Sequence, residues 1–120
     1  MSSTQYPSPA EVAATLDALT ADLIDEPTFK FRKREYGGWY VDHNDLRLGW
    51  VVKNSAGNWA IVTYTTRTGL GTVTLDEATS RQQAAIYLAI SVCYSHRDEY
   101  EIAMEKSYCD EQRYLAIINR

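Results

Sequence analysis

The sequence has only two cysteines and no hydrophobic run long enough to cross a membrane. Two cysteines in 120 residues do not make a disulfide scaffold. The longest nearly unbroken apolar stretch, Ala84 to Tyr94, is about half of the roughly 20 residues that a membrane-spanning helix needs. The first residues lack the basic and apolar segments of a secretory signal, so we expect a cytoplasmic protein with reduced thiols at Cys93 and Cys109.

A positive net charge is also missing. The net charge of −4 and the isoelectric point near 5.1 disfavour a general polyanion binder, because bulk affinity for nucleic acid needs a positive field. The charges are unevenly distributed, however. Residues 1–29 carry five acidic and no basic side chains, whereas residues 30–72 carry seven basic and three acidic ones. The middle of the chain is therefore locally basic.

Length and composition predict one α+β domain over residues 1–120, with residues 1–7 as a flexible N-terminal tail. An N-terminal helix is expected because Ser8-Pro-Ala-Glu11 is a capping box. The apolar residues that follow recur every three or four positions, as on one face of a helix, and they are Val12, Leu16, Leu19 and Leu23. Asp25-Glu-Pro27 ends this helix.

Alternation of apolar and polar residues then predicts an antiparallel sheet of four or five strands. Phe29 and Phe31 face one side, and the basic residues between and after them face the other. A second strand resumes after the Tyr36-Gly-Gly-Trp39 turn. After the polar turn at residues 42–45, a third strand alternates Leu46, Leu48, Trp50 and Val52 with Arg47, Gly49, Val51 and Lys53.

The composition of residues 54–58 is typical of a hairpin loop, so the third strand should pair antiparallel with residues 59–65. Residues 66–71 then turn the chain into a short strand, residues 72–75. Capping boxes at Thr74 and Ser80 both precede a long, buried helix that runs to about Ser95. A kink or a new cap follows, and residues 110–118 form either a short C-terminal helix or a last strand.

No group of residues specifies chemistry, and we assign no catalytic, cofactor or metal residues. Asp42-His43-Asn44-Asp45 concentrates metal-capable side chains, but Asp and Asn are equally typical of a tight turn. Cys93-x-x-His96 with Cys109 supplies three of the four ligands that a structural zinc site needs. These observations lean against an enzyme, although catalytic groups often assemble from distant positions.

The basic strand at residues 30–34 is the strongest candidate for a partner-binding surface. Its side chains should be joined by cations of a neighbouring strand and by nearby aromatic rings, and the full set is Lys30, Arg32, Arg34, Tyr36, Trp39, Arg47 and Lys53. Positive charge beside aromatic rings suits an acidic protein or a nucleic acid. The alternative is an ordinary solvated face, because Lys and Arg protect an edge strand from aggregation.

The order of elements from Gly57 onward resembles the three-strand-plus-helix DNA-binding domains of integrase arm-binding modules and plant ethylene-response factors. The matching residues are Gly57-x-Trp59, Leu70-Gly71-x-Val73, Glu77, Ala84-Ala85 and Tyr87. The strand at residues 59–65 lacks the arginines with which those families read bases. The resemblance therefore concerns architecture and carries over no DNA-contact residue.

The leading hypothesis is a non-enzymatic binding or accessory protein, such as an inhibitor or regulator, with a protein as its partner. Acidic net charge and abundant aromatic residues favour a protein contact, whereas the basic strand makes nucleic acid the alternative partner. A small enzyme with an unrecognised site ranks third. We expect no membrane contact, and the sequence leaves open whether the protein forms a homodimer.

Overall fold

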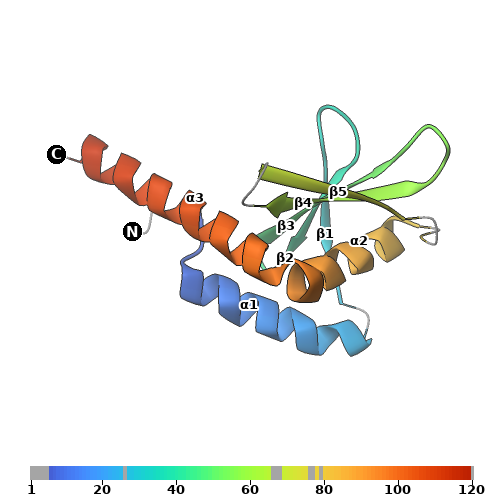
Figure 1. Ribbon diagram of the computed structural model, residues 1–120, viewed down its shortest axis with the longest axis horizontal. Coiled ribbons are helices and arrows are strands. Elements are labelled where there is room, and N and C mark those ends of the chain that lie inside the picture. The colour runs from blue at the N-terminus through green and yellow to red at the C-terminus, as the bar shows by residue number, and fades with distance from the viewer. Residues whose placement is uncertain (1–5, 26, 66–68, 76–77, 79, 120) are drawn as a thin grey trace.

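The computed structural model describes residues 6–25, 27–65, 69–75, 78 and 80–119 (Figure 1). The described part is an α+β fold, as expected, with an antiparallel sheet and three α-helices. The helices are α1 (Pro9–Asp22), α2 (Arg81–Ile90) and α3 (Arg97–Ile118). The strands are β1 (Lys30–Lys33), β2 (Trp39–His43), β3 (Leu46–Lys53), β4 (Trp59–Thr65) and β5 (Gly69–Leu75). A 3-10 turn, Leu23–Asp25, follows α1, and a π-helical turn, Ser91–Ser95, joins α2 to α3.

The five strands form a meander in the order β1-β2-β3-β4-β5, so each strand pairs antiparallel with its neighbour in sequence. The predicted pairing of β3 with β4 across residues 54–58 is confirmed, with Lys53 opposite Trp59. The polar turn between β2 and β3 consists of Asn44 and Asp45, which both have positive φ, of 48° and 66°. Those angles are typical of the tight two-residue turn that suits the twist of a hairpin.

One hydrophobic core lies between the sheet and the helices, and α1 and α2 lie on the same side of the sheet (Figure 1). The helical stripe predicted for α1 is confirmed, because Val12, Leu16 and Leu19 are fully buried. The capping box is formed as well, since the Glu11 N–H donates to the Ser8 hydroxyl oxygen at 3.3 Å and the Ser8 N–H donates to the Glu11 carboxylate at 3.4 Å. We call the sheet face that packs on the helices the inner face, and the opposite one the outer face.

The expected alternation along β3 is wrong beyond Leu48. Asp42 of β2 lies opposite Arg47, but Val41 lies opposite Gly49, so β3 contains one extra residue and the register shifts. This bulge turns Val51 into the core and turns Trp50 to the outer face, opposite Tyr40. Gly49 makes the bulge possible, since it has a φ of 152° and a Cβ there would collide with the carbonyl oxygen of Val62.

The expectations for the later helices hold only in part: residues 81–95 are helical and largely buried, as expected, but not as one α-helix, and the C-terminal helix is not short. Ser80, not Thr74, caps α2 through its hydroxyl, and α2 has only 10 residues. The backbone then widens into the π-helical turn, in which the His96 N–H donates to the Ser91 carbonyl at 2.8 Å. The 22-residue α3 follows, and it includes residues 110–118, which are helical. The long helix is therefore α3, and it buries only Tyr100 and Met104.

Candidate functional site

The basic strand β1 lies at one edge of the sheet, next to β2. Lys30 and Arg32 project from the outer face, opposite Asp42 and Tyr40, while Phe31 packs toward the core. Lys30, Arg32 and Lys33 are all exposed, and none of them forms an ion pair with a residue in the described part of the chain. The edge therefore presents three uncompensated positive charges.

Lys33 was not among the candidates from the sequence. Its position alternates with Arg32, and alternation assigns such a residue to the buried side. In the structure Lys33 pairs with Trp39 at the end of the strand, where it is exposed. The signal that could have found it is the lysine itself, because a lysine side chain is almost never fully buried without a partner.

Arg34 and Arg47, by contrast, are stacked on aromatic rings of the outer face. The Arg34 guanidinium carbon lies 4.0 Å from the centre of the Trp50 ring and 5.3 Å from that of Tyr40. The Arg47 guanidinium carbon lies 3.9 Å from the centre of the Tyr40 ring. Tyr40 and Trp50 meet edge to face, with ring centres 6.0 Å apart. Two cations and two rings thus form one stacked group, which we call the arginine–aromatic stack.

Hydrogen bonds hold both arginines of this stack in place. Arg47 donates from Nε and Nη2 to the two carboxylate oxygens of Asp42, at 2.9 and 3.3 Å. Arg34 donates from Nη1 to the Gly37 carbonyl at 3.0 Å, and its Nε is buried. The two guanidinium groups therefore stabilise the β1–β2–β3 hairpins, and the rings they cover are less accessible to a partner.

The remaining candidates do not join this surface. Trp39 lies on the inner face, half-buried against the core, with the Arg81 guanidinium carbon 4.4 Å from its ring centre. Lys53 lies opposite Trp59 at the end of β3. It is exposed, and it also lies on the inner face. Tyr36 is at the tip of the β1–β2 turn and is 89% exposed. The structure therefore brings together Lys30, Arg32, Arg34 and Arg47, with Tyr40 and Trp50 as rings that the sequence analysis had not assigned to the site.

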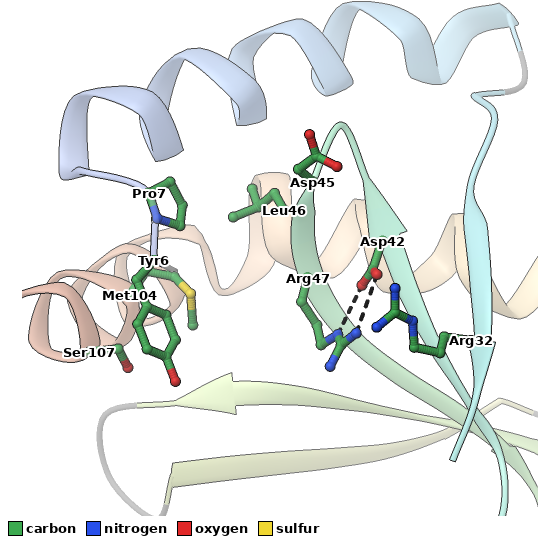
Figure 2. A pocket seen from close by; sticks show the side chains of 9 residues that line it. All are labelled: Tyr6, Pro7, Arg32, Asp42, Asp45, Leu46, Arg47, Met104 and Ser107. Carbon is green, nitrogen blue, oxygen red and sulfur yellow. Dashed lines mark hydrogen bonds and ion pairs between the residues drawn. The ribbon is translucent and has the colours of Figure 1, made fainter. Parts of the chain in front are cut away.

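A pocket of about 470 Å³ opens beside these residues, between the sheet, α3 and the N-terminal segment (Figure 2). Arg32, Asp42 and Arg47 line it from the sheet, and Met104 and Ser107 line it from α3. The N-terminal segment is held there by a hydrogen bond from the Tyr6 backbone N–H to the Glu111 carboxylate, at 3.2 Å. A pocket of this size accepts a side chain or a small ligand. Arg32 belongs both to this pocket and to the strand edge.

His43 does not have the surroundings of a catalytic base. It is buried at the end of β2, with Nδ1 3.1 Å from the Thr28 carbonyl and Nε2 3.4 Å from the Asn44 side-chain nitrogen. Its ring packs edge to face on Phe29, with ring centres 6.1 Å apart. These contacts join the start of β1 to the β2–β3 turn, so they indicate a structural role.

The cysteine and histidine residues near α3 are separated. Cys93 is buried, and its thiol lies 3.7 Å from the Leu16 carbonyl, whereas Cys109 is exposed and unbridged. Burial raises the pKa of the Cys93 thiol, with smaller opposing effects from Thr20 and Arg97. His96 lies 4.0 Å from the Glu99 carboxylate instead. Within the described ranges, no three His, Cys, Asp or Glu side chains gather as a metal site would require.

Exposed apolar side chains gather on the last turns of α3, where Tyr114, Ile117 and Ile118 are more than half exposed. This end of the helix extends away from the sheet (Figure 1). Apolar side chains alone suit many partners, and we assign this surface no role.

None of the helices in the described part of the chain has the length and apolar character needed to span a membrane. Compared with known proteins, the chain matches no family model, no curated protein and no solved structure. Its function is therefore inferred from the surface chemistry described above.

Proposed function

We propose that this chain is a non-enzymatic accessory protein that inhibits or regulates another protein by direct contact through the basic edge of its sheet. The observation that carries this proposal is the set of three exposed cations, Lys30, Arg32 and Lys33, without ion partners among the described residues. Acidic side chains of a partner would compensate these charges. We place the protein in the cytoplasm, where an exposed thiol such as that of Cys109 stays reduced.

The state of the aromatic rings supports a protein partner over nucleic acid. Single-stranded nucleic acids bind proteins by stacking bases on open aromatic faces. Tyr40 and Trp50 already stack on Arg34 and Arg47, and Trp39 stacks on Arg81. A base would have to displace an arginine from each of these rings.

Nucleic acid remains the second candidate because of Tyr36. Its ring is 89% exposed at the tip of the turn that follows the basic strand, so it offers one free stacking surface beside the cations. Phosphate contacts would make affinity fall steeply as salt rises.

Affinity capture from a lysate of the native cells, with and without nuclease, tests the proposal. The test variant is Lys30→Glu with Arg32→Glu, and the matched control is Lys106→Glu with Arg113→Glu, whose residues are also exposed. Each pair turns two cations into two anions, which changes the net charge by −4, from −4 to −8. We expect a captured protein that is retained after nuclease treatment and that only the edge variant fails to capture. Partners lost with nuclease would favour nucleic acid, and capture that is equal for both variants would contradict the proposal.

A further inference from the structure

We propose that β1 is a docking strand, to which an extended, acidic segment of the partner protein adds as a further strand of the sheet. This inference rests on the proposed function and states how the contact is made. It follows from the direction of the backbone groups of β1, the charge of its side chains and the way in which the strand is held.

Within the described residues, the outward backbone groups of β1 have no hydrogen-bond partner, because β1 is an edge strand whose neighbour is β2. In an antiparallel pair, opposite residues alternate between pairs that exchange hydrogen bonds and pairs that do not. The Arg34 N–H donates to the Gly38 carbonyl at 3.0 Å, so the backbone N–H and C=O groups of Arg34 point toward β2. The backbone groups of Arg32 and Lys30, two and four residues earlier, point toward β2 as well. The N–H and C=O groups of Phe31 and Lys33 therefore point away from the sheet, toward a strand that could pair with them.

The edge is a rigid template, because it is fixed at both ends and from one face. Before the strand, the Thr28 carbonyl is 3.1 Å from His43 Nδ1, and Phe29 is buried in the core. After it, Arg34 is held by the turn and by the Trp50 ring. Within it, the Phe31 ring lies under Arg81, 4.1 Å from its guanidinium carbon. A template that is already ordered reduces the entropic cost of binding.

The charge of the edge selects the partner. Lys30 and Arg32 flank the outer side of the position where a further strand would lie, and Lys33 flanks the inner side, next to Phe31. Opposite charges on facing residues of neighbouring strands stabilise the pair. A segment that alternates acidic and apolar residues would place its acids toward Lys30 and Arg32 and its apolar residues toward Phe31.

The same charges disfavour a second copy of this chain as the occupant. Two β1 edges would bring their cations face to face, and like charges directly opposite each other destabilise a strand pair. The other edge strand, β5, covers residues 69–75, whose sequence has no acidic residue to offer β1. An acidic segment of another protein is therefore the occupant to which the edge is complementary.

Binding of a synthetic peptide to the full chain tests the strand pairing. The probe is a fluorescein-labelled peptide of alternating glutamate and valine, about eight residues long, as in a long strand. One control peptide has lysine in place of glutamate, and another has the same sequence with backbone N-methylation. We expect the glutamate peptide to bind at least tenfold more tightly than either control. Equal binding of the N-methylated peptide would overturn strand pairing.

Amide hydrogen exchange with this peptide locates the contact. In a strand added beside β1, the amides of Phe31 and Lys33 become protected, whereas that of Tyr36 in the turn does not. We expect exchange at Phe31 and Lys33 to slow at least tenfold in the complex. Binding without protection at these two amides would contradict the inference.

Two substitutions at one position separate this inference from the proposed function. Lys33→Gln removes the charge and keeps the N–H, whereas Lys33→Pro removes both, and an outward-facing edge position tolerates proline. We expect capture of the native partner to be about fivefold weaker for Lys33→Pro than for Lys33→Gln, the effect of one hydrogen bond. Equal capture by the two variants would overturn strand addition, while protein binding that needs Lys30 and Arg32 would still stand. A dimer in solution that Lys33→Pro dissolves would assign the edge to a second copy, and would also overturn the inference.

Discussion

Replacement of Gly49 by alanine should strongly destabilise the protein, because the bulge in β3 leaves no room for a side chain. The added Cβ would collide with the Val62 carbonyl oxygen, a backbone atom that cannot rotate away. Overpacking of this kind costs about 1 to 3 kcal/mol. A φ of 152° at a residue with a side chain adds about 1 to 3 kcal/mol of backbone strain. The expected loss is therefore about 2 to 6 kcal/mol out of a typical total of about 5 to 15 kcal/mol.

Gly57→Ala is the matched control. Gly57 also has a positive φ, of 87°, but a Cβ at this position would meet nothing within 4 Å. Its cost should be limited to the backbone conformation, at about 1 kcal/mol. The two variants thus differ mainly in the space that surrounds the added methyl group.

Urea unfolding followed by tryptophan fluorescence measures both losses. We expect Gly49→Ala to lose at least about 1 kcal/mol more than Gly57→Ala, which is the lower limit of the overpacking cost. Equal losses for the two variants would refute the role given to the bulge, and with it the register that places Trp50 opposite Tyr40.

Further predictions concern the stack, the core and the buried thiol. Arg34→Ala should cost about 1 to 2 kcal/mol in urea unfolding and shift the tryptophan emission, because Arg34 covers Trp50; unchanged emission would count against the stack. Tyr100→Phe should cost about 1 to 2 kcal/mol, because it removes the 2.6 Å hydrogen bond from the Tyr100 hydroxyl to the Arg47 carbonyl; a change near zero would contradict this. In the native state a thiol reagent should modify Cys109 at once and Cys93 only on unfolding. Since burial raises the pKa of the Cys93 thiol above its ordinary value, the unfolded state releases the thiol proton first. Stability should therefore fall as the pH rises through the ordinary pKa of a thiol, and Cys93→Ala should reduce that fall.

The elements that could be predicted from the sequence are those with local causes. The capping box at Ser8 and the stripe from Val12 to Leu19 specify α1 within a few turns of chain. The loop at residues 54–58 likewise specifies the β3–β4 hairpin, because the Asn54 side chain accepts hydrogen bonds from two backbone N–H groups within that loop.

What could not be predicted depends on contacts between distant residues. A glycine within an alternating strand does not reveal whether it forms a bulge, and at Gly49 the approach of the Val62 carbonyl decides this. Because of that one-residue shift, Trp50 lies on the outer face and Lys53 on the inner face, each on the face opposite to the one expected. The split between stacked and exposed cations has a similar cause. Arg34 and Arg32 look alike in sequence, and only the β2–β3 register places rings beside Arg34.

The central claim is that this chain binds another protein along β1, and photo-crosslinking in the native cell tests it most directly. A photoreactive phenylalanine analogue replaces Lys33 at the outward edge in one variant, and replaces the exposed Lys106 of α3 in the other. The account predicts one protein crosslinked from position 33 and not from position 106, with its attachment in an acidic segment of that protein. Crosslinks that are equal from both positions, or that join position 33 to nucleic acid, would contradict it.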